Sequence, residues 1–232
     1  MATWNVLHRV HALNWSEDVV GRWPDEPARI AAITARLAVR TERVIALQEV
    51  SGDQLTSLRD ALPGRTFHAF RYPRVPAPRR GGCPLRDPGE YLVLLVDGAG
   101  REVAAESFPD DPGKGALAVQ VAGTLVVATH LSGDRRHTRQ LARLAELTAA
   151  APTVVLLGDF NADRATVTSG LGTGFAVAAL PPDALPTRPG TSGSASVRID
   201  HVVARCAVVT GAAVEDVAGL SDHNLVREDI TV

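Results

Sequence analysis

The residues best suited to chemistry lie in one segment, TVVLLGDFNAD at 153–163. Its apolar run at 154–157 contains β-branched residues and predicts a buried strand. Asp159 and Asn161 follow two positions apart, a spacing that points both side chains to one face of an extended segment. A carboxylate and an amide presented together suit a hard cation or a phosphate-bound water. Asp and Asn also cap helices and close turns, so the pair alone leaves a structural role open.

A calcium-binding loop is the first alternative for this segment. Asp159, Asn161 and Asp163 match the first three ligand positions of such a loop. The motif then requires a glycine at its sixth position and a glutamate at its twelfth, where this chain has Arg164 and Gly170. The calcium loop is therefore excluded.

Other polar residues that can bind a metal recur at or near the ends of apolar, strand-like runs. Each has an ordinary explanation when taken alone, because a single His near a core is usually hydrogen-bonded and a single Asp after a strand usually lies in a turn. Their joint placement is the informative pattern, since an apolar scaffold holds such groups rigidly. The set comprises Asn5, Glu49, His130, Asp159, Asp200, Asp222 and His223.

This set of residues predicts metal-assisted attack of water on phosphorus. Asn5 and Glu49 offer oxygen ligands that suit Mg²⁺, with Mn²⁺ as a substitute, because Mg²⁺ binds through one or two carboxylates plus substrate phosphate. The metal would neutralise charge on the phosphoryl oxygen and the leaving group. Asp159 would orient or deprotonate the attacking water, and Asn161 would fix it.

Two histidines complete the predicted site. His223 paired with Asp200 would be an imidazole oriented by a carboxylate, able to stabilise a pentavalent phosphate or to move a proton. His130 would be a second donor to the same oxygens. A serine nucleophile is a weaker alternative, because residues 221–223 are sequence neighbours and no GxSxG elbow is present. The HxxxH spacing of zinc hydrolases and a glycine-rich phosphate loop are also absent from the sequence.

Composition limits the class of protein. One domain over residues 1–232 is favoured by the length, and a hydrophobic fraction of 45% is ample for a core. The 24 basic and 26 acidic residues give a net charge of −2, so the chain lacks the global basic field that long nucleic acids usually need. Cys83 and Cys206 fit no metal-ligand spacing and are expected to be free thiols. We expect a cytoplasmic protein, since no signal peptide or apolar run of ~20 residues is evident. We also expect a monomer without a protein partner.

The hydrophobic pattern alternates between helical and strand periods. Helices are expected to start at Asp25 and at Ser51, and a third is expected over 138–149. Residues 8–25 and 73–90 read as loops, and the four strands between 91 and 129 as an antiparallel meander. Mixed helices and antiparallel strands in one core indicate an α+β layered fold. The expected strands cover residues 2–7, 43–47, 66–72, 91–96, 101–107, 115–121, 124–129, 154–157, 197–204, 207–214 and 224–231.

The basic loop at 73–90 is either a solvated excursion or a substrate-facing loop that supplies cations. If it faces the substrate, Arg79 and Arg80 would clamp phosphate groups together with Arg135 and Arg136.

At the polar residues described above, the chain resembles the endonuclease/exonuclease/phosphatase superfamily, the DNase-like group of metal-dependent hydrolases. The matching segments occur in the family's order and are TWNV at 3–6, LQEV at 47–50, THLS at 129–132, GDFNAD at 158–163, RIDHV at 198–202 and SDHNLV at 221–226.

The resemblance implies a four-layer α/β/β/α sandwich of two mixed β-sheets flanked by helices. It implies that Glu49 holds Mg²⁺ with help from Asn5, and that Asp222 lies near the metal. It also implies that the pair at 159 and 161 handles the nucleophile, that Asp200 supports His223, and that His130 contacts phosphate. The family's usual "SR" dipeptide is not recognisable at 89–98. The opening of the chain resembles the deadenylase-type subgroup most.

We therefore expect a Mg²⁺-dependent phosphoester hydrolase. Its substrate would be a nucleotide, a short single-stranded nucleic acid or a phosphorylated metabolite, as a phosphomonoester or a phosphodiester. A DNA endonuclease or exonuclease is one alternative, and a non-catalytic binding relative is another. No amphipathic membrane-binding segment is evident, so stable membrane association is not expected.

Overall fold

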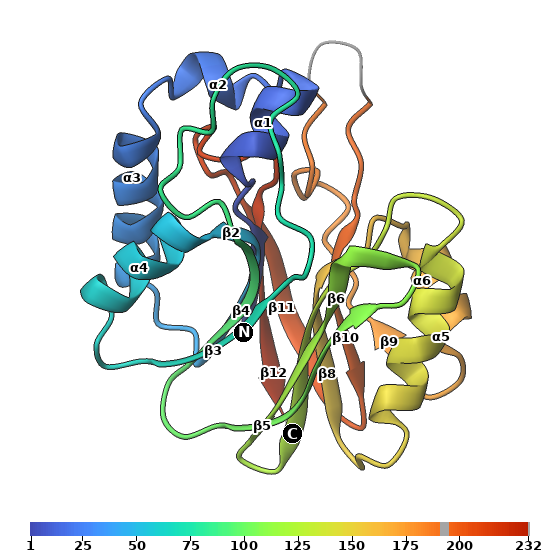
Figure 1. Ribbon diagram of the computed structural model, residues 1–232. Coiled ribbons are helices and arrows are strands. Elements are labelled where there is room, and N and C mark those ends of the chain that lie inside the picture. Colours follow the sequence, from blue (N-terminus) through green and yellow to red (C-terminus); the bar gives the residue numbers. More distant parts are fainter. Residues whose placement is uncertain (191–194, 232) are drawn as a thin grey trace.

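A computed structural model describes residues 1–190 and 195–231 of the chain. These residues form two six-stranded sheets that pack face to face, with helices on the outer faces (Figure 1). In strand order, the first sheet comprises β11 (Val208–Glu215), β12 (Leu225–Thr231), β1 (Ala2–Asn5), β2 (Val44–Ser51), β4 (Glu90–Val96) and β3 (Thr66–Arg71). The second comprises β5 (Arg101–Phe108), β6 (Asp111–Val121), β7 (Thr124–His130), β8 (Val154–Asp159), β10 (Asp200–Arg205) and β9 (Ala176–Val177). The predicted four-layer sandwich of two mixed sheets is confirmed.

The core between the sheets is built from alternate residues of their central strands. Leu92 and Leu94 of β4 belong to the same buried cluster as Leu117 of β6 and Leu157 of β8. Because helices cover the outer faces, β8 is buried along its whole length, as expected of a strand with both faces covered. Rigid central strands of this kind fix the positions of the polar residues at their ends.

Helices α3 (Glu26–Ala38) and α4 (Gly52–Ala61) cover the first sheet, with Ile33, Leu37 and Leu58 packed against its outer face. Both helices begin where the sequence predicts. Asp25 accepts a hydrogen bond from Ala28 N, and the Ser51 hydroxyl accepts one from Gln54 N at 3.1 Å. These caps satisfy backbone donors that the first helical turn leaves free.

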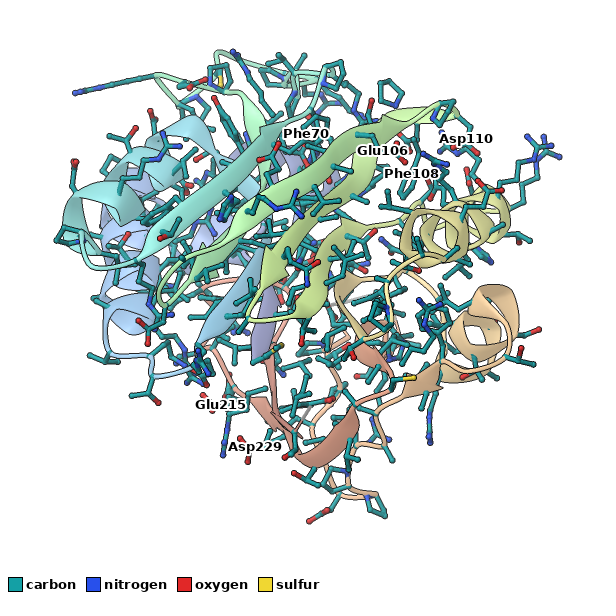
Figure 2. All side chains as sticks on the ribbon, turned by 90° about the horizontal axis from the view of Figure 1, so that it is seen from below. Phe70, Glu106, Phe108, Asp110, Glu215 and Asp229 are labelled. Atoms are coloured by element: carbon teal, nitrogen blue, oxygen red, sulfur yellow. The ribbon has the colours of Figure 1, made fainter. Side chains whose placement is uncertain are left out.

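Helices α5 (His137–Thr148) and α6 (Arg164–Leu171) cover the second sheet. Two contacts tie α5 to the β5–β6 edge, where Figure 2 labels Glu106, Phe108 and Asp110. Arg143 Nε donates to Glu106 at 2.8 Å, and Gln140 Nε2 donates to Asp110 at 3.0 Å. The α5 helix is thereby held against the sheet at the end where β7 and β8 finish.

Short helices are the main elements that the sequence prediction missed. The expected loop at 8–25 contains α1 (Arg9–Trp15) and α2 (Val19–Arg22). The α1 helix is capped by His8, whose Nδ1 accepts from Val10 N at 3.2 Å, rather than by a Ser, Thr, Asp or Asn. The α6 helix has an ordinary Asp163 cap, but only eight residues follow it, too few to show a clear period.

Two expectations about strands need correction. The β2 strand was expected to end at 47, but it continues to Ser51 through a register shift between Leu47 and Val50. The predicted four-strand meander is divided, because β4 belongs to the first sheet and only β5, β6 and β7 are consecutive neighbours in the second. Alternation of side chains shows which face of a strand is buried but not which sheet the strand joins.

Several smaller expectations have a clear outcome. The chain between β3 and β4 has no regular structure, as predicted, and Cys83 and Cys206 are both free and exposed. Residues 191–194, in a stretch rich in Gly, Pro and Thr, lie outside the described residues. No helix of the described chain is long and apolar enough to span a membrane.

Glu228 provides a stability test remote from the chemistry. Its side chain is buried in β12, and burial raises the pKa of this carboxyl to about 8. The folded protein therefore binds a proton that the unfolded chain has released, so the free energy of unfolding should fall between about pH 4.5 and pH 8. Glu228→Gln should remove this fall and should exceed the wild type in stability at pH 9 by on the order of 3 kcal/mol. Urea unfolding at pH 5 and pH 9 measures the free energy of unfolding of both proteins. If the variant and the wild type differ by the same amount at both pH values, the raised pKa of Glu228 is contradicted.

Candidate active site

The topology brings the ends of four strands to one end of the sandwich. β1 runs parallel to β2, and β7 runs parallel to β8, so Asn5 and Glu49 of one sheet face His130 and Asp159 of the other. Asp200 begins β10 directly opposite Asp159. These elements come from distant parts of the sequence and meet only because the sheets pack face to face.

Asn5 joins the two sheets through a single amide group. Its Nδ2 donates to Glu49 Oε1 at 3.2 Å and to Asp159 Oδ2 at 3.1 Å, while its Oδ1 accepts from Leu7 N at 3.0 Å. In this orientation the NH₂ group faces both carboxylates and holds them together. The expected role of Asn5 as a metal ligand needs the amide to turn over, and it stays a prediction.

The backbone aims the Glu49 side chain. Glu49 lies in the β2 irregularity with φ +57°, and such bulges redirect a side chain next to a strand end. The carboxylate also accepts from His8 N at 3.1 Å. Burial alone would raise the pKa of Glu49, but the positive charges of His11, His130 and Lys114 outweigh it and hold the pKa well below its usual range.

Asp159 is the central group of the site. Its Oδ2 lies 3.3 Å from His130 Nε2 and 3.8 Å from His223 Nε2, in addition to the Asn5 contact. Burial opposes ionisation, yet the two imidazoles hold the pKa of this carboxyl far below its ordinary value. Gly158 before it permits the close approach of β7, because a Cβ there would lie 2.0 Å from Thr129 O.

Asn161 reaches the site by a different route from the one expected. It lies beyond β8 with φ +48°, so the extended geometry that would place it on the same face as Asp159 does not apply. Its backbone N–H donates to Asp159 Oδ1 at 2.9 Å, and its Nδ2 donates to Leu131 O at 2.9 Å. The turn still presents both side chains to the same cavity.

His223 is oriented as predicted. Its Nδ1 lies 2.9 Å from Asp200 Oδ2, and its backbone N–H donates to the Ser221 hydroxyl at 3.1 Å. Burial disfavours the imidazolium, but the carboxylates of Asp200, Asp222 and Asp159 outweigh burial and raise the pKa of His223 to about 10. At neutral pH this ring is a cation with Nε2 directed to the Asp159 side.

Lys114 and Arg188 are site residues that the sequence did not indicate. The Lys114 ammonium lies against the His130 ring, 3.2 Å from Nδ1. Arg188 pairs with Asp222 at 3.0 Å and with Glu17 at 3.1 Å, so a cation lies beside Asp222, and the expected place of Asp222 near a metal stays a prediction. Both cations come from segments without a recognisable motif, and only the fold brings them to the strand ends.

A cavity of about 690 Å³ opens over these groups. Of the four arginines predicted to bind substrate, Arg79 and Arg136 line it. Arg79 stacks over the Trp15 ring at 4.5 Å, and Arg136 pairs with Asp134 at 2.9 Å. Arg80 and Arg135 are exposed and are not among the lining residues. Their role in binding stays a prediction.

The donor set fits a divalent cation that prefers oxygen. Glu49 and Asp159 are both largely buried, both are held ionised, and both approach the same Asn5 and His130 atoms. Each carboxylate, with about four lone-pair sites on its two oxygens, has at least one site beyond those that its hydrogen bonds use. Mg²⁺ keeps several waters and needs only one or two such carboxylates.

The sequence of this chain matches the model of the Endonuclease/Exonuclease/phosphatase family over residues 2–223. The chain belongs to this family. Its members generally hydrolyse phosphoester bonds and generally depend on a divalent metal. No curated protein matches the chain.

Solved structures share the fold over the whole chain. D. rerio TDP2 complexed with a single-strand DNA product has a TM-score of 0.72 and 17% identity, covering 100% of this chain and 98% of that one. D. rerio TDP2 humanized by 14 mutations gives 0.71 and 17%, with the same coverage. An endonuclease/exonuclease/phosphatase from Beutenbergia cavernae DSM 12333 gives 0.69 and 24%, covering 100% and 70%. At these identities the likeness shows the fold alone, so the expected nearness to the deadenylase-type subgroup stays a prediction.

Arg29 holds the loops that carry the site. Its buried guanidinium donates to Val6 O at 2.9 Å, Leu7 O at 2.8 Å and Leu220 O at 2.8 Å, and it pairs with Glu26 at 2.7 Å. The segments after β1 and before β12 are thus fixed to α3 by one side chain.

Removal of this guanidinium should be costly because it leaves a buried carboxylate without its main partner. Arg29→Met should lower the free energy of unfolding by about 3–5 kcal/mol. The double variant Glu26→Gln/Arg29→Met should recover part of this loss, because it removes the buried charge as well. Guanidinium unfolding of the two variants measures the difference, and a double variant no more stable than Arg29→Met would show that the buried charge is not the cause.

Proposed function

We propose that this protein is a Mg²⁺-dependent phosphoester hydrolase that acts on a nucleotide, a short single-stranded nucleic acid or a phosphorylated metabolite. We also propose that residues 1–232 form one catalytic domain. The observation that carries the proposal is the position of Asp159 Oδ2, which lies within 4 Å of Asn5 Nδ2, His130 Nε2 and His223 Nε2. Hydrolysis of a phosphoester needs a group that orients the attacking water, and donors that bind the phosphoryl oxygens.

In this proposal Glu49 holds the metal, with Asn5 and Asp222 beside it. When bound, Mg²⁺ acidifies water and neutralises charge on the phosphoryl oxygens. Glu49 is suited to this role because its pKa is lowered and it stays ionised throughout the physiological pH range. The Asn5 amide and the His8 N–H fix the direction of its two oxygens.

Asp159 orients the attacking water, and Asn161 holds the turn that completes the water site. A carboxylate with a strongly lowered pKa is a weak base, so orientation is a better role for Asp159 than full proton removal. The Asn161 N–H bond to Asp159 Oδ1 leaves Oδ2 directed towards the reacting group.

His223 and His130 stabilise the phosphoryl oxygens. His223 is protonated at neutral pH and held by Asp200, so its Nε2 can donate to an oxygen that gains charge in the transition state. His130 carries the Lys114 ammonium against its ring, which adds a second cation at the same wall of the cavity.

Support for a nucleic-acid substrate comes from the TDP2 structure with a single-strand DNA product and from the cations in the cavity wall, which are Arg74, Arg79, Lys114, Arg136 and Arg188. The local character of this charge, in a chain of net charge −2, favours a short or single-stranded substrate over extended duplex. A DNA nuclease remains the alternative with the clearest signature, since several phosphate contacts give a steep salt dependence.

Glu49→Gln and Asp159→Asn should each lower Mg²⁺-dependent hydrolysis at least about a hundredfold and leave the fold intact, because each removes one ionised group from the reacting centre. Asp229→Asn is a matched control, since Asp229 is an exposed carboxylate on β12 (Figure 2). Turnover by purified variants and their circular dichroism spectra measure the effect. Near-normal turnover of either site variant would exclude the assignment.

His223→Asn should reduce kcat by about a hundredfold with little change in KM, because its proposed contact strengthens in the transition state. His68→Asn, on β3 at the edge of the first sheet, is the control histidine. Steady-state kinetics separate the two parameters. A change in KM alone would mean that His223 binds substrate without stabilising the transition state.

A hydrolysis panel on the purified chain identifies the substrate class. It pairs single-stranded and double-stranded oligonucleotides with mononucleotides and sugar phosphates, in Mg²⁺ and in EDTA, at low and high salt. Cleavage of short single strands in Mg²⁺ only is the expected result. Preference for duplex with a steep salt slope would favour a DNA nuclease, and Mg²⁺ binding without turnover of any substrate would favour a non-catalytic relative.

A further inference from the structure

Beside Glu49, the structure gathers a second group of metal-binding side chains that the proposed hydrolysis does not use. His11 of α1, Glu49 of β2 and Glu90 of β4 each offer one ligand atom, and these atoms lie within 4.8 Å of one another. His11 Nε2 is 3.1 Å from Glu90 Oε2. A cation about 2.0–2.3 Å from each donor keeps the donors roughly 3–4 Å apart. Only small side-chain movements separate the observed arrangement from a metal site.

Several buried polar atoms around this group lack a hydrogen-bond partner within the described part of the chain. They are Glu90 Oε1, the Tyr72 hydroxyl and His8 Nε2. Glu90 is fully buried, Tyr72 N donates to its carbonyl at 2.9 Å, and the His8 and His11 ring centroids are 5.4 Å apart. An unsatisfied buried polar atom costs about 1–3 kcal/mol, so Glu90 Oε1, which belongs to a member of the group itself, indicates that a bound group is accommodated there.

An ion pair between His11 and Glu90 does not explain this arrangement. The pair uses Glu90 Oε2 and leaves Oε1 without a partner. It also brings the Glu49 carboxylate to the same imidazole. Two carboxylates that converge in buried surroundings repel each other, and the cations that face Glu49 and Glu90 leave Glu90 Oε1 without a partner. A divalent cation between the two carboxylates would offset their repulsion and give that oxygen a partner.

We infer that His11, Glu49 and Glu90 form a second divalent-cation site that shares Glu49 with the proposed Mg²⁺ site. One imidazole nitrogen with two carboxylates suits Mn²⁺ and other first-row transition ions, whereas Mg²⁺ prefers oxygen ligands. The inference goes beyond the proposed function, because hydrolysis as proposed uses neither His11 nor Glu90. A cation here adds positive charge at the cavity wall, which includes His11, and so favours a phosphate-bearing ligand.

Mn²⁺ binding to the purified full chain in an excess of Mg²⁺ tests the site. Electron paramagnetic resonance counts bound Mn²⁺, and pulsed measurements detect coupling to an imidazole nitrogen. We expect one Mn²⁺ per chain to persist in Mg²⁺, with nitrogen coupling. Glu90→Gln and His11→Asn should each weaken this binding at least about tenfold, and His11→Asn should also abolish the nitrogen coupling.

Two controls separate this site from other effects. Glu228→Gln changes another buried carboxylate with an unpartnered oxygen, and it should retain the Mn²⁺. Asp159→Asn should lose hydrolysis and retain the Mn²⁺, so failure of the proposed function and failure of this site give different results. Mn²⁺ binding that is unchanged in both Glu90→Gln and His11→Asn would overturn the inference. Mn²⁺ bound to the wild-type chain without nitrogen coupling would also overturn it, and that result does not depend on the folding of any variant.

Discussion

The site depends on carboxylates that stay ionised while largely buried. Glu49 and Asp159 lie at the end of an apolar sandwich, where an isolated carboxylate would take up a proton. The protonated His223 faces Asp159, and the amide of Asn5 faces both carboxylates, so these groups oppose protonation. Charge balance therefore comes from neighbours fixed by the fold rather than from solvent. In the proposed function, the same balance would let the strand ends attract a cation and phosphate oxygens.

Face-to-face packing of the two sheets is what makes this balance achievable. Each sheet contributes one parallel pair of strands whose carboxyl ends point the same way, and the Asn5 amide spans the gap between them. Each central strand is covered on both faces, so a shift of its register would expose one apolar face and bury polar groups. The core therefore fixes the atoms of the site to the precision that its hydrogen bonds require.

Residues that follow strand-like runs could be identified from the sequence, because apolar runs end where the chain leaves the sheet. Asp159 and His130 were found in this way, and the structure brings both to one cavity. Lys114 and Arg188 could not be found, since a single cation in a turn-rich segment has no local pattern. Glu90 was hidden for a different reason. It is the first residue of β4, and only the sheet pairing shows that it lies opposite Ser51, two residues beyond Glu49 on β2.

Three of the seven non-glycine residues with a positive φ in the described chain lie at the site. Leu7, Glu49 and Asn161 are non-glycine residues with φ of +58°, +57° and +48°, a conformation that costs of order 1–3 kcal/mol for each residue. Each one aims a group at the site, since Leu7 N orients the Asn5 amide and Asn161 N orients Asp159. Glycine would relieve the strain at 49 and 161 but would remove the side chains that the site uses. The strain is therefore a consequence of placing polar groups at fixed angles on an apolar scaffold, and the buried interface between the sheets offsets it.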